Sequence, residues 1–277
     1  MKVVKTVEEL RVERKKLQEP VGCVPTMGFL HVGHLSLVRA AHAACRSVAV
    51  SIFVNPSQFG PNEDFEAYPR DMAADLAKLE SEKVDLVFTP GKEDLYPQGF
   101  QTWVTVDEIS KPLEGIIRPG HFRGVATVVA KLFNIVQPAK AFFGQKDAQQ
   151  VAVLRRMVAD LNFPLEIVTC PTLREKDGLA MSSRNSYLNA AERQAAPVLY
   201  RGLNAAKAAY QAGERNAETL RQLVKSELAV EPLARMDYVS CADAASLQEL
   251  DVVEKPALLS MAVFIGKTRL IDNLILE

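Results

Sequence analysis

Long apolar runs are missing from this 277-residue sequence. No run of apolar residues is long enough to cross a bilayer, so we expect no membrane partner. Residues 1–19 are strongly charged and do not resemble a signal peptide. We therefore expect a soluble, cytoplasmic protein.

Cysteine is scarce, and none of the four cysteines belongs to a C-x-x-C pair. This spacing indicates neither a zinc knuckle nor a redox motif. Because Cys23 and Cys170 lie in apolar runs, we expect ordinary buried thiols. The sequence identifies no metal ligands.

A surplus of positive charge is also absent. Lys and Arg number 33 against 34 Asp and Glu, which gives a net charge of −1. Binding to large nucleic acids usually needs a basic stripe, so we expect no nucleic-acid partner. A small anion such as ATP needs only local positive groups and remains compatible with this balance.

What is present is an alternation of short apolar runs and amphipathic stretches in the first two thirds of the chain. The predicted strands are rich in Val, Ile and Phe, as buried parallel strands are; they are Val21–Thr26, Val48–Val54, Val84–Thr89, Ala141–Gly144 and Leu165–Cys170. The predicted helices between them are Leu35–Arg46, Asp71–Glu82, Val125–Val136 and Asp147–Leu161. This alternation predicts an α/β fold with a parallel sheet covered on both faces.

The character of the chain changes near Pro171–Thr172. Two Ala-rich helical stretches follow, Ala191–Ala212 and Ala217–Val230, and then strands at Met236–Cys241, Leu258–Phe264 and Leu270–Leu276. We therefore predict a domain of residues 1–171 and a smaller α+β domain of residues 172–277. A further short strand is expected at Trp103–Val106.

A candidate phosphate site follows the first predicted strand, in the segment Val24–His34. Gly28 and Gly33 permit a close backbone approach, and free backbone N–H groups at the start of the next helix favour phosphate. His31 and His34 are three residues apart, so both rings can project to one side and donate to phosphate oxygens. A chance pair of histidines, or a zinc site completed by another histidine, remains an alternative.

This segment carries neither of the two common nucleotide-binding fingerprints, G-x-x-x-x-G-K-[ST] and G-x-G-x-x-G. A second candidate lies at Lys176–Asn185, which combines a glycine, two hydroxyls and Arg184. Such a loop can bind triphosphate oxygens and close over ATP. The alternative is a solvated loop in which Ser183 or Asn185 caps a helix.

Together, the two segments resemble the nucleotidyltransferase superfamily, which pairs a histidine-x-glycine-histidine loop with a later lysine- or serine-rich loop. Further segments resemble the pantothenate synthetase family in particular. These are Phe53–Gly60, Tyr68–Arg70, Arg118–Val125, Phe142–Asp147 and Asp177–Asn185. They occur in order along nearly the whole chain.

The resemblance implies a fold similar to class I aminoacyl-tRNA synthetases, with a Rossmann-like N-terminal domain, a smaller C-terminal lid domain and a homodimer. It also implies an Mg²⁺-dependent reaction in two steps. Pantoate attacks the α-phosphorus of ATP to give pantoyl adenylate and pyrophosphate, and β-alanine then attacks the adenylate and releases AMP. Activation of the acid divides a difficult amide formation into two feasible displacements.

The resemblance also assigns residues. His34 and His31 are implied as catalytic, and Gln58 and Gln150 as the residues that bind pantoate. The implied ATP-binding residues are Met27, Gly28, Phe29, Leu30, His31, Val32, Gly33, His34, Gly144, Gln145, Lys146, Asp147, Leu173, Met181, Ser182, Ser183 and Arg184.

Elementary chemistry limits some of these roles. The pantoate carboxylate is already ionised at neutral pH, so orientation of ATP suits His34 better than a role as general base. Asp147 is better placed as a helix cap than as a catalyst. Arg118, His121 and Arg123 can bind substrate, form a dimer contact or stabilise a turn, so we leave them outside the catalytic set. The sequence does not identify the group that takes the proton of the β-alanine ammonium.

Two other functions are compatible with parts of the sequence. A transferase of the same superfamily that acts on a phosphorylated acceptor would need additional Arg or Lys residues. A non-enzymatic nucleotide- or RNA-binding module would need a basic face, and the charge balance disfavours one.

Overall fold

The computed structural model describes residues 1–61 and 63–277, which form two compact units. The first contains residues 1–145 and 149–171, and the second contains residues 146–148 and 172–277. The assignment of residues 1–171 to substrate binding and of residues 172–277 to a lid stays a prediction.

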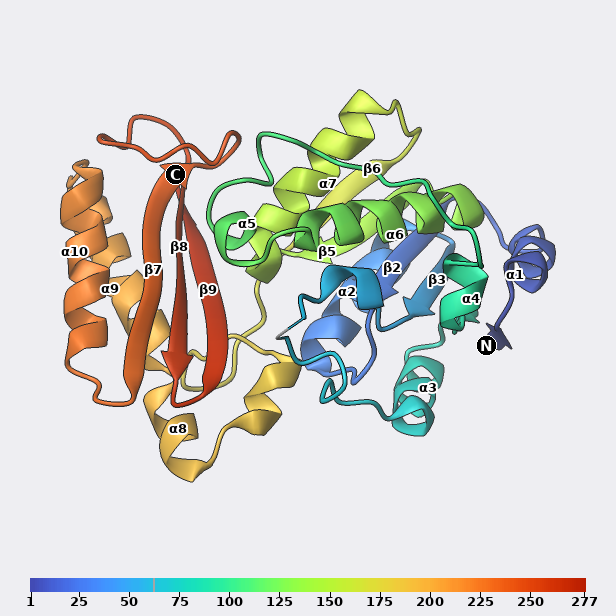
Figure 1. Ribbon diagram of the computed structural model, residues 1–277, viewed down its shortest axis with the longest axis horizontal. Coiled ribbons are helices and arrows are strands. Elements are labelled where there is room, and N and C mark those ends of the chain that lie inside the picture. The colour runs from blue at the N-terminus through green and yellow to red at the C-terminus, as the bar shows by residue number, and fades with distance from the viewer. Residues whose placement is uncertain (62) are drawn as a thin grey trace. The chain divides into compact units, whose positions relative to one another are not determined.

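A six-stranded sheet with the order β1-β4-β3-β2-β5-β6 forms the centre of the first unit (Figure 1). Each pair of neighbouring strands is parallel. The strands are β1 (Lys2–Val4), β2 (Val21–Thr26), β3 (Ser47–Ile52), β4 (Leu86–Phe88), β5 (Lys140–Gly144) and β6 (Glu166–Cys170). The predicted α/β class with a parallel sheet is therefore confirmed.

Helices cover both faces of this sheet. Successive residues of β3 point to opposite faces of the sheet and are buried on both: Ala49 packs into one apolar cluster, whereas Val48 and Val50 pack into another. The first cluster includes residues of α1, α6 and α7, and the second includes residues of α2 and α3. The helices of this part of the chain are α1 (Val7–Arg14), α2 (Val32–Ala44), α3 (Met72–Ser81), α4 (Lys92–Leu95), α5 (Glu114–Ile117), α6 (His121–Val136) and α7 (Ala148–Asp160), with 3₁₀ turns η1 (Pro56–Gln58) and η2 (Gln145–Asp147).

The strand order places three loops beside one another. β2 lies between β3 and β5, and the three strands run in the same direction. Their carboxyl ends therefore share one edge of the sheet, where the chain leaves β2 toward α2, β3 toward η1 and β5 toward η2. The order also reverses at β2, and ligands of open α/β sheets bind at such reversal points.

The second unit is built on an antiparallel sheet of β7 (Ala234–Asp243), β8 (Ala257–Ile265) and β9 (Thr268–Leu276). Its apolar cluster combines the sheet with residues of the helices. These helices are α8 (Ala190–Ala195), α9 (Val198–Gln211) and α10 (Ala217–Ala229), and η3 (Ser183–Tyr187) precedes them.

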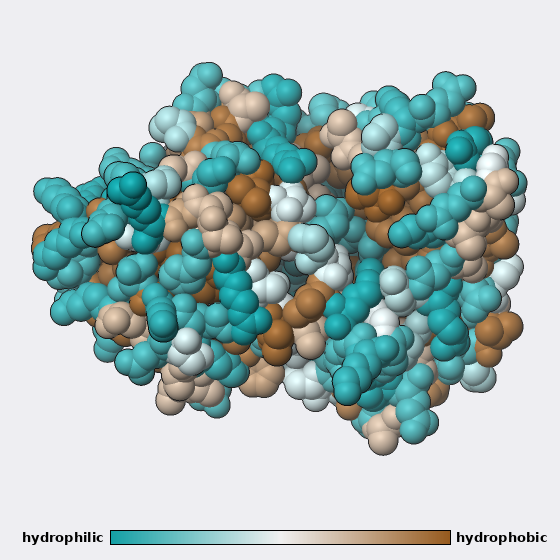
Figure 2. Space-filling view, turned by 180° about the vertical axis from the view of Figure 1, so that it is seen from behind, coloured by the Kyte–Doolittle hydropathy of each residue, from teal (hydrophilic) through white to brown (hydrophobic). Residues whose placement is uncertain are grey.

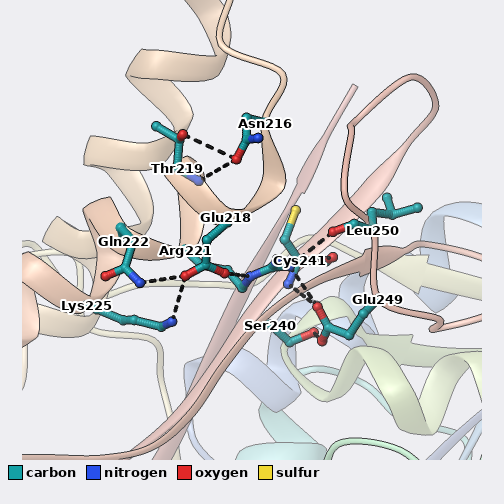
Figure 3. A network of polar contacts seen from close by, with 10 residues as sticks. All are labelled: Asn216, Glu218, Thr219, Arg221, Gln222, Lys225, Ser240, Cys241, Glu249 and Leu250. Atoms are coloured by element: carbon teal, nitrogen blue, oxygen red, sulfur yellow. Dashed lines mark hydrogen bonds and ion pairs between the residues drawn. The ribbon is translucent and has the colours of Figure 1, made fainter.

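Arg221 connects α10 to β7 through a network of hydrogen bonds and ion pairs (Figure 3). Its guanidinium donates to Glu218 on its own helix and to Glu249 in the segment after β7. Glu249 in turn accepts from the Ser240 hydroxyl and the Cys241 amide of β7. This network is a structural feature of the second unit.

Two sequence-based expectations about elements are wrong. Trp103–Val106 is not a strand: the Val104 amide donates to the Thr127 hydroxyl, and Trp103 stacks near Tyr96. The stretch Ala191–Ala212 is not one helix but is divided into α8 and α9, with Pro197 as the residue before α9. Proline has no amide hydrogen to continue a helical ladder.

The surface view is consistent with apolar burial inside the units. On the face shown in Figure 2, hydrophilic residues predominate and hydrophobic ones form small separate groups. Among residues 1–61 and 63–277, no helix is both long and apolar enough to span a membrane.

Candidate active site

The histidine pair begins α2. His31 is the N-cap residue, with extended backbone, and His34 occupies the third helical position. Their ring centroids lie 4.0 Å apart, at an interplanar angle of 35°. The predicted placement of both rings at the start of this helix is therefore confirmed, and the positive end of the helix dipole lies beside them.

Backbone contacts define which nitrogen of each ring carries the proton. The Gly33 amide donates to Nδ1 of His31 at 3.1 Å, and the His31 amide donates to Nδ1 of His34 at 3.3 Å. A nitrogen that accepts a hydrogen bond is unprotonated, so each neutral imidazole carries its proton at Nε2. Both rings thus have an N–H group on the side away from the capping contacts.

The amides of the β2–α2 loop, residues 27–31, are largely occupied within the protein. The Gly28 amide donates to the Thr26 hydroxyl, and the Phe29 and Leu30 amides donate to the Asp75 carboxylate. The expected free backbone N–H groups are therefore not available at these three positions. Phosphate recognition by the imidazole Nε2–H groups of this loop stays a prediction.

Gln58 lies beside this loop. It is buried at the end of η1, and its Nε2 approaches the sulfur of Met27 at 3.0 Å. Asn55, which is 1% exposed, donates from Nδ2 to Oε1 of Gln58 and to the Gly124 carbonyl. The Asn55 contact fixes which end of the Gln58 amide accepts and leaves Nε2 as a donor on the Met27 side.

Arg118 and His121 hold the same turn from the other side. His121 donates from Nδ1 to the Gln58 carbonyl at 2.7 Å, and Arg118 donates to Nε2 of His121 at 3.1 Å. Arg118 also forms a bidentate ion pair with the Glu63 carboxylate. Burial, followed by the positive charge of Arg118, lowers the pKa of His121 to about 4. Of the roles left open by the sequence, these contacts favour stabilisation of the turn.

The end of β5 leads into a short polar segment that contains Lys146. Gly144 ends the strand, and Gln145, Lys146 and Asp147 form η2 before α7. The Lys146 ammonium lies 3.6 Å from the Asp147 carboxylate and is partly exposed. Gln150 follows on the first turn of α7 and is half-buried. The neighbouring Gln149 is buried and has a structural role, since it binds the Glu114 amide and the Pro112 carbonyl.

The second candidate loop belongs to the other unit and starts as a hairpin of residues 173–181. The Met181 amide donates to the Leu173 carbonyl at 3.0 Å, and Arg174 pairs with Ala180 as an isolated bridge. Ser182 then caps η3 by accepting from the Arg184 amide, and Ser183 is buried. The capping residue is therefore Ser182, and not Ser183 or Asn185 as considered from the sequence.

Arg174 anchors this hairpin to β9. Its guanidinium makes two hydrogen bonds to the Asp272 carboxylate, at 2.6 and 2.9 Å, and one to the Gly178 carbonyl. It also lies over the ring of Tyr200, at 4.0 Å from the centroid. Gly178 has φ +93°, and an added Cβ would lie 2.1 Å from Tyr200, so only glycine fits there.

The chain is similar to known proteins over its whole length. The family model for pantoate-beta-alanine ligase matches residues 2–275. The chain belongs to the pantoate–β-alanine ligase family. Pantothenate synthetases of Chloroflexus aurantiacus and Herpetosiphon aurantiacus are 62% and 61% identical to it; the alignments cover 100% of this chain and 99% and 100% of those proteins.

Solved structures of this ligase family are also similar to the chain. Pantothenate synthetase from Thermus thermophilus has a TM-score of 0.95 at 48% identity, with 99% of both chains covered. A pantoate–β-alanine ligase from Francisella tularensis, complexed with beta-gamma ATP and β-alanine, has a TM-score of 0.81 at 36% identity, with 99% of this chain and 97% of that chain covered.

Sequence reasoning about this ligase missed the residues that support the site. Asn55 was visible only as part of a motif, and nothing in the sequence linked Asp75 or Asp272 to the loops they hold. Their partners lie 45 residues away for Asp75 and Leu30, and 98 residues away for Asp272 and Arg174. The ligand contacts assigned to the individual site residues stay predictions.

Proposed function

We propose that the chain makes pantothenate from pantoate and β-alanine in two steps, with ATP as the activating substrate. Pantoate first forms an adenylate and releases pyrophosphate, and β-alanine then displaces AMP. The family membership supports the overall ligation. The observation that carries the ATP-dependent first step is the histidine pair at the start of α2, with both Nε2–H groups set by backbone contacts.

In the first step, the ionised pantoate carboxylate attacks the α-phosphorus, and no general base is required. Negative charge grows on the phosphate oxygens as pyrophosphate leaves. Donors that are already oriented toward such charge stabilise the transition state without reorganisation. We assign this role to His31 and His34, with Lys146 and Arg184 as further cations for the phosphates.

Gln58 is proposed to bind pantoate together with Gln150. Its Nε2 donor is oriented by Asn55, and Met27 lies beside it. An amide can both donate and accept, which suits the hydroxyls and carboxylate of pantoate. The loops after β2 and β3 leave the same edge of the sheet, so the carboxylate and the phosphates can meet there.

Magnesium is proposed as part of the ATP substrate complex. In the part of the chain that the structure describes, no group of three or more His, Cys, Asp or Glu residues could hold a metal ion. This fits Mg²⁺ bound mainly by phosphate oxygens and water, as is usual for nucleotide-bound magnesium. When bound, the ion would neutralise part of the triphosphate charge.

The family resemblance further supports a cytoplasmic homodimer. Light scattering after gel filtration measures the mass directly. A mass twice the monomer value of 30.5 kDa is expected at micromolar concentration. A single species at the monomer mass would contradict the dimer.

The reaction is tested by measuring AMP and pantothenate with ATP, Mg²⁺ and pantoate, with and without β-alanine. We expect equal amounts of AMP and pantothenate only when both acids are present. The variant His34→Ala should lose a hundredfold or more of adenylate formation, since one oriented donor is worth roughly that factor. His42→Ala, in the last turn of the same helix, serves as the control and should keep its activity. Normal turnover by His34→Ala would contradict the role of this histidine.

A further inference from the structure

The β2–α2 loop adopts a backbone that does not form without support. Gly28 has φ +85° and Phe29 has φ +49°, so both lie in the left-handed region. This region is disfavoured for a residue with a side chain such as Phe29. Contacts outside the loop must therefore stabilise its conformation.

Asp75 supplies those contacts from the first turn of α3. Oδ2 accepts from the Phe29 amide and Oδ1 accepts from the Leu30 amide, both at 2.7 Å. Each carboxylate oxygen thus binds one of two successive amides. Asp75 is only 1% exposed, so these charge-assisted bonds are protected from water.

Lys78, one turn further along α3, completes the arrangement. Its ammonium donates to the Leu30 carbonyl at 2.7 Å and lies 3.9 Å from Oδ1 of Asp75. The helix therefore binds the amide and the carbonyl of Leu30 with opposite charges. The lysine also offsets the cost of burying the carboxylate.

Gly28 allows the carboxylate to approach. A Cβ at this position would lie 3.0 Å from Oδ2 of Asp75 and 3.0 Å from a methyl group of Ile52. Both the space and the positive φ therefore require glycine here. The loop sequence and the aspartate on α3 form one unit, although they lie about 46 residues apart.

We infer that Asp75 is a positioning residue for the ATP-activating histidines. It acts through the Phe29–Leu30 backbone, which leads directly into the His31 cap and so sets the direction of both Nε2–H groups. The inference rests on the proposed function of His31 and His34. Asp75 itself has no contact with the reacting atoms in this assignment.

The test compares Asp75→Asn with Asp85→Asn. An asparagine at 75 turns an NH₂ group toward one of the two amides, so one contact becomes repulsive. Asp85 is the control for loss of a carboxylate that binds backbone, because it accepts a single amide, that of Val48 at 2.7 Å, elsewhere in the same unit. Each variant is assayed for pyrophosphate release, with kcat and the KM values for ATP and pantoate measured separately, and for its melting temperature.

We expect Asp75→Asn to lower kcat/KM for ATP at least tenfold while the KM for pantoate changes less than twofold. Asp85→Asn should leave both within twofold of wild type, although both variants melt earlier. The inference is overturned if Asp75→Asn keeps kcat/KM for ATP within twofold, or if Asp85→Asn loses the same factor.

Hydrogen exchange of the wild type and Asp75→Asn, without substrates, separates this inference from the proposed function. Faster exchange at Phe29 and Leu30 in the variant supports the positioning role of Asp75 even if the wild type makes no pantothenate, whereas unchanged exchange overturns it. If Asp75→Asn does not fold, Lys78→Met replaces it, since that side chain is 41% exposed. A raised KM for ATP with an unchanged KM for pantoate supports the inference, and unchanged kinetics overturn it.

Discussion

At the scale of single residues, His121 shows how a buried ring can be held neutral. The Gln58 carbonyl can only accept and the Arg118 guanidinium can only donate, so the ring must carry its proton at Nδ1 and accept at Nε2. Protonation would place a second N–H against a cation. Burial and this charge explain why the pKa of His121 is lowered to about 4.

We predict a pH dependence of stability from this residue. In the unfolded chain His121 titrates near pH 6.5, so between about pH 6.5 and 4 the unfolded state binds more protons than the folded state. The contribution of His121 is complete above this range and is lost as the pH falls through it. His121→Asn, which cannot titrate, should be less stable at pH 7.5 but should lose less stability between pH 6.5 and 4.

Urea unfolding of both proteins across this range gives the measurement. Glu63 and Glu114 lie near His121 and are present in both proteins, so the difference between the two curves isolates the histidine. Parallel curves for wild type and variant would contradict the lowered pKa.

At the same scale, the sequence was informative where chemistry is local. The histidine spacing predicted a pair at a helix start, because three residues are almost one helical turn. It did not show that Nδ1 of each ring accepts a backbone amide, since that depends on the extended backbone of His31. Nor did it indicate the Asp75 contacts, because they arise only when α3 packs beside the loop.

At the scale of elements, α6 packs directly against η1. An added Cβ at Gly124 would lie 2.2 Å from the Ser57 carbonyl oxygen and 2.7 Å from the Gln58 nitrogen. The Gly124 carbonyl also accepts from Asn55. The glycine therefore sets the distance between the helix and the turn that carries Gln58.

We predict that Gly124→Ala displaces Gln58. The KM for pantoate should rise fivefold or more, while the KM for ATP changes little. Alanine normally stabilises a helix relative to glycine by about 1 kcal/mol, so a loss of stability here would come from the clash. The matched control is Gly202→Ala in α9, where the added Cβ would approach Val224 no closer than 3.3 Å. Equal KM values for pantoate in wild type and Gly124→Ala would contradict the prediction.

Elements with a clear hydrophobic pattern could be predicted from the sequence, whereas short elements could not. The run Val21–Thr26 is apolar up to its last residue and coincides with β2. The sequence did not reveal β1, whose three residues carry too little pattern, although Val3 and Val4 pair with β4. Trp103–Val106 has the composition of a strand, but its polar contacts lie with a helix residue and not with a neighbouring strand.

At the scale of the whole molecule, the change of character near Pro171 was visible from the sequence because helices and antiparallel strands replace the alternating pattern. The sequence did not show that residues 146–148 group with residues 172–277. The Lys146 carbonyl accepts from Nδ2 of Asn273, which is 127 residues away on the last strand. Contacts at such a separation leave no local signal.

Two groups of residues are assigned to ATP, the histidine pair of α2 and residues 181–184. If His34 and Arg184 act on one triphosphate, their effects on adenylate formation should be coupled. We expect His34→Ala and Arg184→Ala each to lower kcat/KM for ATP strongly, and the double variant to lose less than the product of the two factors. Coupling energies of roughly 0.5–3 kcal/mol are usual for residues that share partners.

The control cycle pairs His34→Ala with Arg221→Met, because Arg221 belongs to the structural network between α10 and β7 (Figure 3). Those effects should multiply, with a coupling below about 0.5 kcal/mol, as expected for independent sites. Multiplicative effects in the His34–Arg184 cycle as well would mean that the two residues do not act on the same nucleotide. The ATP-binding role of residues 181–184 would then be wrong, whereas the role of the histidine pair would stand.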